Sequence, residues 1–218
     1  MSDGETGLII KSLTVGMFAT NCYLIGCVKT GEGIVIDPGA QGKKIIETIA
    51  SMGLKIKYIL NTHGHIDHIG ANGKLKDELA VPIYLNERDL PLYENPGYGL
   101  KMILKKQPHP DIFIKNGDKI TVGTITLTVL ETPGHTPGSV CFLTEKILFC
   151  GDTLFAGSVG RTDLVGGSHA ELMRSIKRKL LILSPDTEIY PGHGPTTTIG
   201  DEIRNNPYLG AAGSLKDF

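Results

Sequence analysis

Residues 63–68 read His63-Gly64-His65-Ile66-Asp67-His68, so three imidazoles and one carboxylate fall within six positions. This stretch follows a β-type run at residues 57–62 and precedes a helix-like segment. Histidine nitrogens and carboxylate oxygens are common ligands for zinc and similar divalent ions. An ordinary polar loop would account for a single histidine, but not for four such groups. The stretch therefore predicts a metal site.

The spacing within the stretch suggests more than one ion. In an extended strand successive side chains point to opposite sides, so His63 and His65 would point the same way. Asp67 and His68 are adjacent, at the start of the expected helix, and cannot both follow that direction. We therefore expect them to serve a second ion beside the first.

Three further candidate ligands each follow a β-type run. His135 comes after residues 125–130, Asp152 after residues 147–150, and His193 after residues 188–190. A glycine precedes each of them and allows a sharp exit of the backbone from the strand. In layered α/β folds functional groups gather at the carboxyl ends of strands, so these segments are expected to share one pocket with residues 63–68.

The order of these motifs resembles the metallo-β-lactamase superfamily. Within it, the chain is most similar to the glyoxalase II group of hydroxyacylglutathione hydrolases and their short bacterial relatives. The opening element of the superfamily is matched by residues 33–39, a strand that ends in Asp37. The resemblance runs from about residue 10 to residue 208 and implies an α/β fold, the four-layer αββα sandwich.

The resemblance also implies a set of ligands for two divalent ions. His63, His65 and His135 would hold one ion, Asp67, His68 and His193 the other, and Asp152 would bridge them. Asp37 would orient a ligand or its loop, although a purely local role in an Asp-Pro-Gly turn is an equal alternative. We expect zinc, with iron and manganese as alternatives.

The implied reaction is hydrolysis of a small-molecule thioester by a metal-bridging hydroxide, with Asp67 as a possible proton shuttle. Asp152 disfavours antibiotic hydrolysis, because many lactamases of this fold differ at that place. The main alternative is a persulfide dioxygenase with a single iron at His63, His135 and Asp152. A lactonase, an RNA-processing nuclease and a non-catalytic metal-binding module are less favoured.

Two segments are candidates for substrate contact. Residues 89–111 form a proline- and glycine-rich insertion that is either a lid or surface padding. If it is a lid, the side chains expected to reach substrate are Tyr93, Tyr98, Lys101 and Met102. Beyond Asp152, Arg161 could face an anionic substrate, because a guanidinium suits carboxylates. The alternative is an internal contact between Arg161 and Asp163 that stiffens the loop.

The remaining expectations concern the chain as a whole. Its 218 residues suit a single domain with a flexible start at residues 1–6. After His193 only residues 200–208 and a short tail follow, so the helical region that grips glutathione in full-length glyoxalase II is expected to be absent. Residues 8–15 form a β-like run and are predicted to be a strand. Residues 43–52 and 72–79 are predicted to be helical, and Ser168 with Glu171 matches a capping box at the start of a further helix.

Composition limits the partners and the location. A formal net charge of −1 offers no general attraction to nucleic acid, and no apolar run approaches the length of a membrane span. No signal sequence is recognisable, and four cysteines without Cys-x-x-Cys spacing favour reduced thiols. We therefore expect a cytoplasmic enzyme that binds neither nucleic acid nor membranes, and its oligomeric state stays open.

Overall fold

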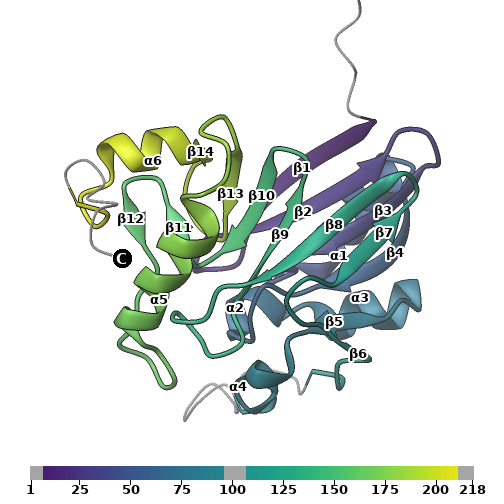
Figure 1. Cartoon of the computed structure of the whole chain (residues 1–218). Coiled ribbons are helices and arrows are strands. Elements are labelled where there is room, and N and C mark those ends of the chain that lie inside the picture. Colours follow the sequence, from purple (N-terminus) through teal and green to yellow (C-terminus); the bar gives the residue numbers. More distant parts are fainter. Residues whose placement is uncertain (1–6, 96–106, 211–218) are drawn as a thin grey trace, which may run out of the picture.

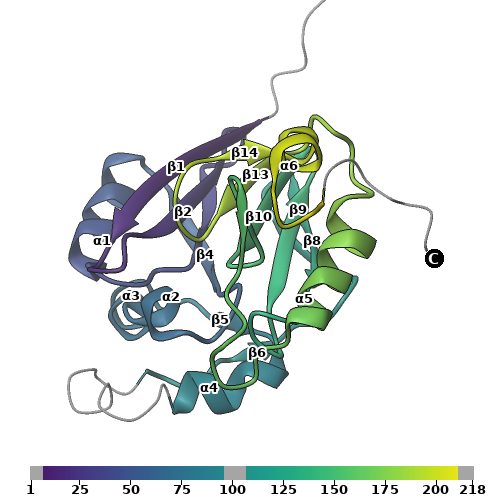
Figure 2. The ribbon, with the colours of Figure 1, turned by 90° about the vertical axis from the view of Figure 1, so that its left-hand side faces the viewer.

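The computed structural model describes residues 7–95 and 107–210. Two six-stranded sheets pack face to face in the middle, and helices cover their outer faces (Figure 1). Figure 2 shows α1, α2 and α3 on one side of the sandwich and α5 on the other. The predicted four-layer αββα sandwich is confirmed.

The first sheet is built by the N-terminal half of the chain. Its strands, in spatial order, are β1 (Leu8–Val15), β2 (Thr20–Cys27), β3 (Glu32–Ile36), β4 (Lys55–Leu60), β5 (Ile83–Leu85) and β6 (Ile112–Phe113). The first three strands are antiparallel, and β3 to β6 are parallel. The parallel strands place several carboxyl ends at one edge of the sheet.

The second sheet comes from the C-terminal half. Its spatial order is β14 (Thr197–Thr198), β13 (Glu188–Pro191), β10 (Ile147–Gly151), β9 (Val140–Thr144), β8 (Ile125–Glu131) and β7 (Lys119–Val122). Only β10 and β13 are paired in parallel; the other neighbours are antiparallel. A small hairpin of β11 (Leu154–Phe155) and β12 (Ser158–Val159) follows β10.

Within residues 7–95 and 107–210, six α-helices, one 3-10 helix and one π-helix complete the layers. They are α1 (Gly42–Ser51), α2 (Ile66–Ile69), α3 (Asn72–Leu79), the 3-10 helix η1 (Glu87–Asp89), α4 (Leu90–Glu94), α5 (His169–Ser175), the π-helix η3 (Ile176–Leu180) and α6 (Ile199–Asn205).

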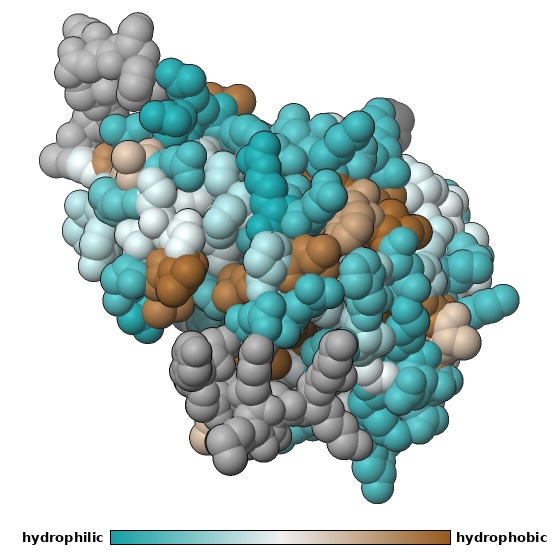
Figure 3. Space-filling model, turned by 90° about the horizontal axis from the view of Figure 1, so that it is seen from below, coloured by the Kyte–Doolittle hydropathy of each residue, from teal (hydrophilic) through white to brown (hydrophobic). Residues whose placement is uncertain are grey.

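Seen from below, the molecule carries a band of apolar side chains between polar ones (Figure 3). That end therefore exposes apolar as well as hydrophilic side chains.

Three large apolar clusters fill the spaces between the layers in the described part of the chain, and a smaller fourth one consists of Ile69, Leu85 and Tyr93. The central one joins the inner faces of both sheets and includes Phe142 and Phe149, which are fully buried. A second lies between the first sheet and α1 and α3, and a third between the second sheet and α5. The β2 strand, Thr20-Asn21-Cys22-Tyr23-Leu24-Ile25-Gly26-Cys27, is buried along its whole length because both its faces are covered.

Element boundaries follow the sequence pattern closely. The predicted strand at residues 8–15 and the helix at residues 72–79 occur with those bounds, and the helix expected at residues 43–52 runs one residue earlier. Ser168 caps α5 by accepting a hydrogen bond from the Glu171 N–H at 3.3 Å. The reciprocal half of the capping box is absent, because the Ser168 N–H donates to the carbonyl of Gly134.

The insertion at residues 89–111 is less irregular than expected. Its first residues form the end of η1 and the whole of α4, with Pro91 in the first turn, where its missing N–H is not needed. Tyr93 is 3% exposed, and its hydroxyl donates to the Pro108 carbonyl, so it anchors the base of the insertion. Tyr98, Lys101 and Met102 lie outside the described residues, as do residues 1–6.

Cys22, Cys27, Cys141 and Cys150 are all free and buried, which agrees with the expected reduced thiols. Among the described residues, no helix combines the length and apolar character that a membrane crossing requires.

Candidate metal centre

The seven predicted ligands converge at one end of the sandwich, each just after a strand. His63 and His65 follow β4, and Asp67 and His68 lie in the adjoining helix α2. The remaining three come from the other half of the chain and follow β8, β10 and β13: His135, Asp152 and His193. The structure thus brings these segments together at the strand ends, as the sequence pattern predicted.

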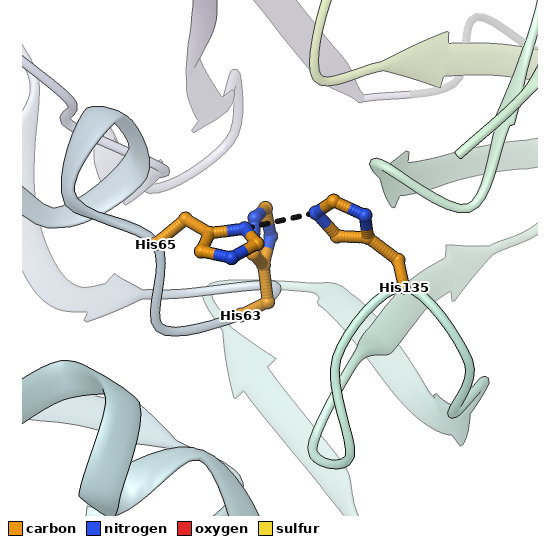
Figure 4. A group of neighbouring side chains, drawn as sticks. All are labelled: His63, His65 and His135. Carbon is orange, nitrogen blue, oxygen red and sulfur yellow. Dashed lines mark hydrogen bonds between the residues drawn. The ribbon is translucent and has the colours of Figure 1, made fainter. Parts of the chain in front are cut away.

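His63, His65 and His135 form the first group. Figure 4 shows their rings converging from two separate loops. Their nitrogen atoms lie within 4.8 Å of one another, and His65 Nδ1 is 2.9 Å from His135 Nε2. His63 is 1% exposed, yet its Nε2 atom has no hydrogen-bond partner among the described residues. A buried nitrogen without a partner is costly in a protein unless another group, such as a cation, is bound to it.

Asp67, His68 and His193 form the second group. Asp67 Oδ2 lies 3.5 Å from His68 Nε2 and 3.3 Å from His193 Nε2, and the two imidazole nitrogens are 3.3 Å apart. Residues 63–68 thus supply His63 and His65 to the first group and Asp67 and His68 to the second, in agreement with the predicted division.

Asp152 lies between the two groups. Its Oδ2 atom is 3.6 Å from His135 Nε2 in the first group and 3.5 Å from His193 Nε2 in the second. Its Oδ1 atom is 3.4 Å from His68 Nε2 and is buried without a hydrogen-bond partner among the described residues. A carboxylate so placed can reach ions in both groups.

Asp37 contacts the second group from behind. Its Oδ2 atom lies 2.9 Å from His68 Nδ1 and accepts a hydrogen bond from the Thr62 hydroxyl at 2.6 Å. Its Oδ1 atom accepts from the Thr62 N–H at 2.8 Å. Asp37, His63 and His68 also lie close enough to be considered as a third group. However, both Asp37 oxygens are already engaged, so Asp37 orients His68 and the loop of Thr62.

Hydrogen bonds at Nδ1 leave the Nε2 atoms of four histidines facing the cluster. Nδ1 of His68 faces Asp37, Nδ1 of His135 lies 2.7 Å from the Arg161 carbonyl, and Nδ1 of His193 lies 3.0 Å from the Phe18 carbonyl. These oxygens can only accept, so each Nδ1 carries a proton. The Nδ1 atom of His63 faces the Thr62 hydroxyl, which already donates to Asp37. Such hydrogen bonds typically orient metal-binding histidines.

The start of β2 holds the second group in place, a role that the sequence did not reveal. The Thr20 hydroxyl donates to Asp67 Oδ2 at 3.0 Å, and Thr20 forms an isolated β-bridge with His193. The Asn21 side chain donates to the carbonyls of Pro191 and Gly194 on either side of His193. A Thr-Asn pair at the start of a buried strand is a weak signal that could have suggested this role.

Burial determines the protonation of the first group. Desolvation lowers the pKa of His63 well below its ordinary value and that of His65 to about 4, with the neighbouring histidines adding to the effect. Both rings are therefore neutral near pH 7 and have a lone pair available for a cation.

The second group is dominated by charge pairing. Burial alone would lower the pKa of His68 and of His193. The surrounding carboxylates outweigh this effect, so the pKa of His68 lies well above its ordinary value and the pKa of His193 is raised to about 9. Burial alone would likewise raise the pKa of Asp67, but hydrogen bonding from His193 and the charge of His68 bring it to about 2. Among the protein groups alone, protons balance the carboxylates, and a bound cation would take over that role.

Arg161 forms the internal contact that was the alternative to substrate binding. Its guanidinium donates to both oxygens of Asp163, at 2.8 Å and 2.7 Å, on an exposed loop. Its carbonyl accepts from His135, so the loop supports the first group through its backbone. A contact between Arg161 and substrate stays a prediction.

Two further histidines and a cysteine belong to none of the groups described above. His169 is exposed in the first turn of α5, and His109 pairs with the Pro110 carbonyl. Cys150 is fully buried on β10, and its thiol donates to the Leu154 carbonyl, as expected for a small core residue.

Close backbone approach explains two of the glycines around the cluster. A Cβ atom on Gly39 would lie 1.5 Å from the Asp67 carbonyl oxygen. A Cβ atom on Gly192 would lie 2.1 Å from Asp152 Oδ1 and 2.7 Å from His68 Cε1. Any side chain at these positions would displace the cluster, so the glycines are required by packing.

The fold and the cluster together define an αββα protein with two groups of histidine and aspartate at its strand ends. A sequence profile of the metallo-β-lactamase superfamily matches residues 15–193. The chain therefore belongs to the metallo-β-lactamase superfamily.

Individual relatives are similar over nearly their whole length. The chain is 39% identical to the hydroxyacylglutathione hydrolase GloC of Haemophilus influenzae, with 92% of this chain and 97% of GloC covered. The B3 metallo-β-lactamase BLEG-1 superimposes with a TM-score of 0.87 at 38% identity, over 93% of this chain and 100% of BLEG-1. TTHA1623, solved in a di-iron-bound form, superimposes with a TM-score of 0.84 at 40% identity, over 91% of this chain and 100% of TTHA1623.

Proposed function

We propose that the chain is a binuclear metal-dependent hydrolase of small-molecule thioesters, of the hydroxyacylglutathione hydrolase type. The observation that carries this proposal is the position of Asp152, whose carboxylate lies within 3.6 Å of histidines from both groups. The similarity to GloC supports the thioester substrate.

The cluster fits a pair of divalent ions. His63, His65 and His135 would hold one, Asp67, His68 and His193 the other, and Asp152 would contact both. Among the described residues, three buried side-chain atoms lack a hydrogen-bond partner, and two of them, His63 Nε2 and Asp152 Oδ1, belong to the cluster and are expected to bind a cation; the third is Asn72 Oδ1. Zinc suits this mixture of nitrogen and oxygen ligands, and the di-iron form of TTHA1623 makes iron the first alternative.

Divalent ions in this position would supply Lewis acidity, which lowers the pKa of bound water and polarises a carbonyl oxygen. The protein positions the reactants around them. Asp37 holds His68 through Nδ1, and Thr20 holds Asp67 through Oδ2, so the carboxylate keeps one orientation. Asp67 is also the group we assign to accept a proton during turnover. Release of the thiolate needs little help from an acid, because thiols have a pKa of about 8.5.

The alternative with a single iron would use His63, His135 and Asp152. The approach of Asp152 Oδ2 to His135 Nε2, at 3.6 Å, is compatible with it. That alternative leaves Asp67, His68 and His193 without a common purpose, although they lie as close together as the first group. We therefore favour the binuclear hydrolase.

The test is a set of assays on protein purified without added metal and then loaded separately with zinc or iron. The substrates are S-lactoylglutathione, a thioester without glutathione, glutathione persulfide with oxygen, and a β-lactam. We expect hydrolysis of at least one thioester at two metal ions per chain, and its loss in Asp152→Asn. Persulfide-dependent oxygen uptake at one iron per chain, without thioester hydrolysis, would overturn the proposal, and so would hydrolysis of the β-lactam alone.

A further inference from the structure

Asp89 is a buried carboxylate outside the ligand set. It is the last residue of η1, the short helix that follows β5, and it is 0% exposed. Burial of a charged group is unfavourable unless hydrogen bonds compensate. Three donors point at this carboxylate: the N–H groups of Gly64 and Gly138 and the hydroxyl of Thr136.

These donors belong to the two loops that carry the first group of histidines. Gly64 lies between His63 and His65, and its N–H donates to Asp89 Oδ2 at 2.8 Å. Thr136 follows His135, and its hydroxyl donates to the same oxygen at 2.7 Å. Asp89 Oδ2 therefore connects the two loops through a single atom.

The second oxygen strengthens the connection to the His135 loop. The Gly138 N–H donates to Asp89 Oδ1 at 2.6 Å. A Cβ atom on Gly138 would lie 2.7 Å from Asp89 Cγ, and one on Gly64 would lie 2.9 Å from the Asp89 carbonyl oxygen. Both loops thus pack directly against Asp89, and neither can shift without breaking these hydrogen bonds.

The helix that follows Asp89 is itself fixed on its other side. The Tyr93 hydroxyl on α4 accepts from the Asn72 side chain, which also donates to Asn61 Oδ1. The Asn61 side chain in turn donates to the His68 carbonyl. A chain of hydrogen bonds within the protein therefore connects the helix after Asp89 to residues 63–68.

We propose that Asp89 is a positioning residue that sets the spacing between the His63–His65 loop and the His135 loop, so that these three histidines can bind one ion. The proposal rests on the metal assignment of the proposed function. It predicts a selective defect. Loss of the Asp89 carboxylate should weaken binding at the first group and spare the group of Asp67, His68 and His193, whose supports are Asp37 and Thr20.

The test compares Asp89→Asn with Glu202→Gln. Glu202 is a matched control, because it is 3% exposed and also accepts from a backbone N–H, a threonine hydroxyl and an amide. It lies on α6, and the donors, which belong to Gly157, Thr197 and Asn206, are not in the two groups of the cluster. Both variants exchange one carboxylate oxygen for an NH2 group that cannot accept. The probe is Co²⁺ alone, titrated into metal-free protein and followed by visible absorption, with thermal unfolding recorded in parallel.

We expect wild type and Glu202→Gln to bind two equivalents of Co²⁺, and Asp89→Asn to lose affinity for one of them by about 10–100-fold. A His193→Ala background identifies the affected group, because its remaining site contains His63, His65 and His135. Adding Asp89→Asn to that background should weaken the remaining binding by the same factor. Thr136→Val, which removes a single donor to Asp89, should give a smaller loss at the same site if Asp89→Asn does not fold.

Three results would contradict the inference. Two Co²⁺ equivalents bound by Asp89→Asn with wild-type affinity would show that the carboxylate does not set the spacing. An equal loss in Glu202→Gln would make the effect one of general stability. Wild-type affinity in Thr136→Val, with an unfolded Asp89→Asn, would assign Asp89 to folding alone. If wild type itself binds no Co²⁺, the proposed function fails together with this inference, whereas the first three results leave the proposed function intact.

Discussion

Asp37 controls which nitrogen of His68 faces the cluster. Because its carboxylate can only accept, the proton sits on Nδ1 and Nε2 is directed toward Asp67 and Asp152. Asp37 adopts a positive φ of 50°, a conformation that asparagine also tolerates. An asparagine at this position therefore changes the hydrogen bonding with little backbone strain.

We predict that Asp37→Asn lowers metal affinity at the second group by about 10–100-fold, because His68 loses its acceptor. Calorimetric titration of metal-free protein with zinc measures this effect. Asp163→Asn serves as the control, since Asp163 is exposed and pairs with Arg161 away from His68. Unchanged affinity in Asp37→Asn would show that His68 needs no orienting group.

We predict that Asp89 makes the free energy of unfolding depend on pH. Burial raises the pKa of Asp89 more than the hydrogen bonds from Thr136, Gly64 and Gly138 lower it. The folded protein then binds this proton more tightly than the unfolded chain does. This tighter proton binding contributes to the free energy of unfolding. The contribution is complete below the unfolded pKa of about 3.9 and is lost as the pH rises through the pKa of the folded state.

Urea unfolding of metal-free wild type and Asp89→Asn, measured from about pH 4 to pH 8, tests this effect on a carboxyl whose unfolded pKa is about 3.9. We expect the unfolding free energy of wild type minus that of the variant to fall with rising pH and then to level off. A difference that rises with pH would mean that the carboxylate is stabilised by folding, contrary to the direction of its pKa shift.

The clustered histidines and aspartates were predictable from the sequence, but most of the residues that support them, Asp37 excepted, were not. Each ligand segment follows a β-type run and includes a glycine, so local pattern alone marks residues such as His135 and Asp152. Thr20 contacts Asp67 across 47 residues, and Asp89 contacts Gly138 across 49. Asp89 also follows a β-type run, at β5, but no glycine or histidine accompanies it. Such contacts depend on tertiary packing, which no local pattern encodes.

At the scale of elements, the sharp exits from the strands position the cluster. Gly39, after β3, packs so closely against the backbone of α2 that a Cβ atom would overlap the Asp67 carbonyl oxygen. Gly7, at the opposite end of the first sheet, has its nearest neighbour, Lys29 Cγ, at 4.0 Å from an added Cβ atom. Neither residue has a positive φ, so the two differ in crowding rather than in backbone conformation.

We therefore predict that Gly39→Ala destabilises the fold by about 1–3 kcal/mol and impairs metal binding, because α2 must move. Gly7→Ala should leave both properties close to wild type. Denaturant unfolding and zinc titration of the two variants provide the measurement. Tight binding of two zinc ions by Gly39→Ala would show that α2 can shift without disturbing Asp67 and His68.

Regular elements were predicted more accurately than irregular ones. The β-like run at residues 8–15 and the helix-like run at residues 72–79 occur with the predicted bounds. Helix α4 was not predicted, because its five residues include a proline and are too few to show a helical period. The continuation of α5 as a π-helix was also not predicted, since its buried residues, such as Ile176 and Leu180, fit an ordinary helical stripe equally well.

At the scale of the whole molecule, the cluster joins the two halves of the sandwich. His63, His65, Asp67 and His68 come from the first half, and the other ligands come from the second. Direct hydrogen bonds also cross the boundary, as from the Val140 N–H to the Thr62 carbonyl and from the Asn21 N–H to the Gly192 carbonyl. Sequence periodicity suggested the layers, but the arrangement of the halves was implied only by the family resemblance.

Because bound ions would connect both halves, we predict that chelation lowers the thermal stability of the whole fold. Ions present at about 1,000 times their Kd add about 4 kcal/mol, which corresponds to roughly 10 °C in Tm for a chain of this size. Calorimetry of zinc-loaded protein with and without EDTA measures the difference. His193→Ala should show a smaller decrease, and an unchanged Tm in wild type would indicate that the cluster binds no structural ion pair.

The most direct examination of the cluster is anomalous diffraction at the zinc edge from crystals of the zinc-loaded protein. We predict two peaks, one among His63, His65 and His135 and one among Asp67, His68 and His193, with Asp152 in contact with both. A single peak that excess zinc does not supplement, or an Asp152 carboxylate turned away from both groups, would contradict the binuclear centre.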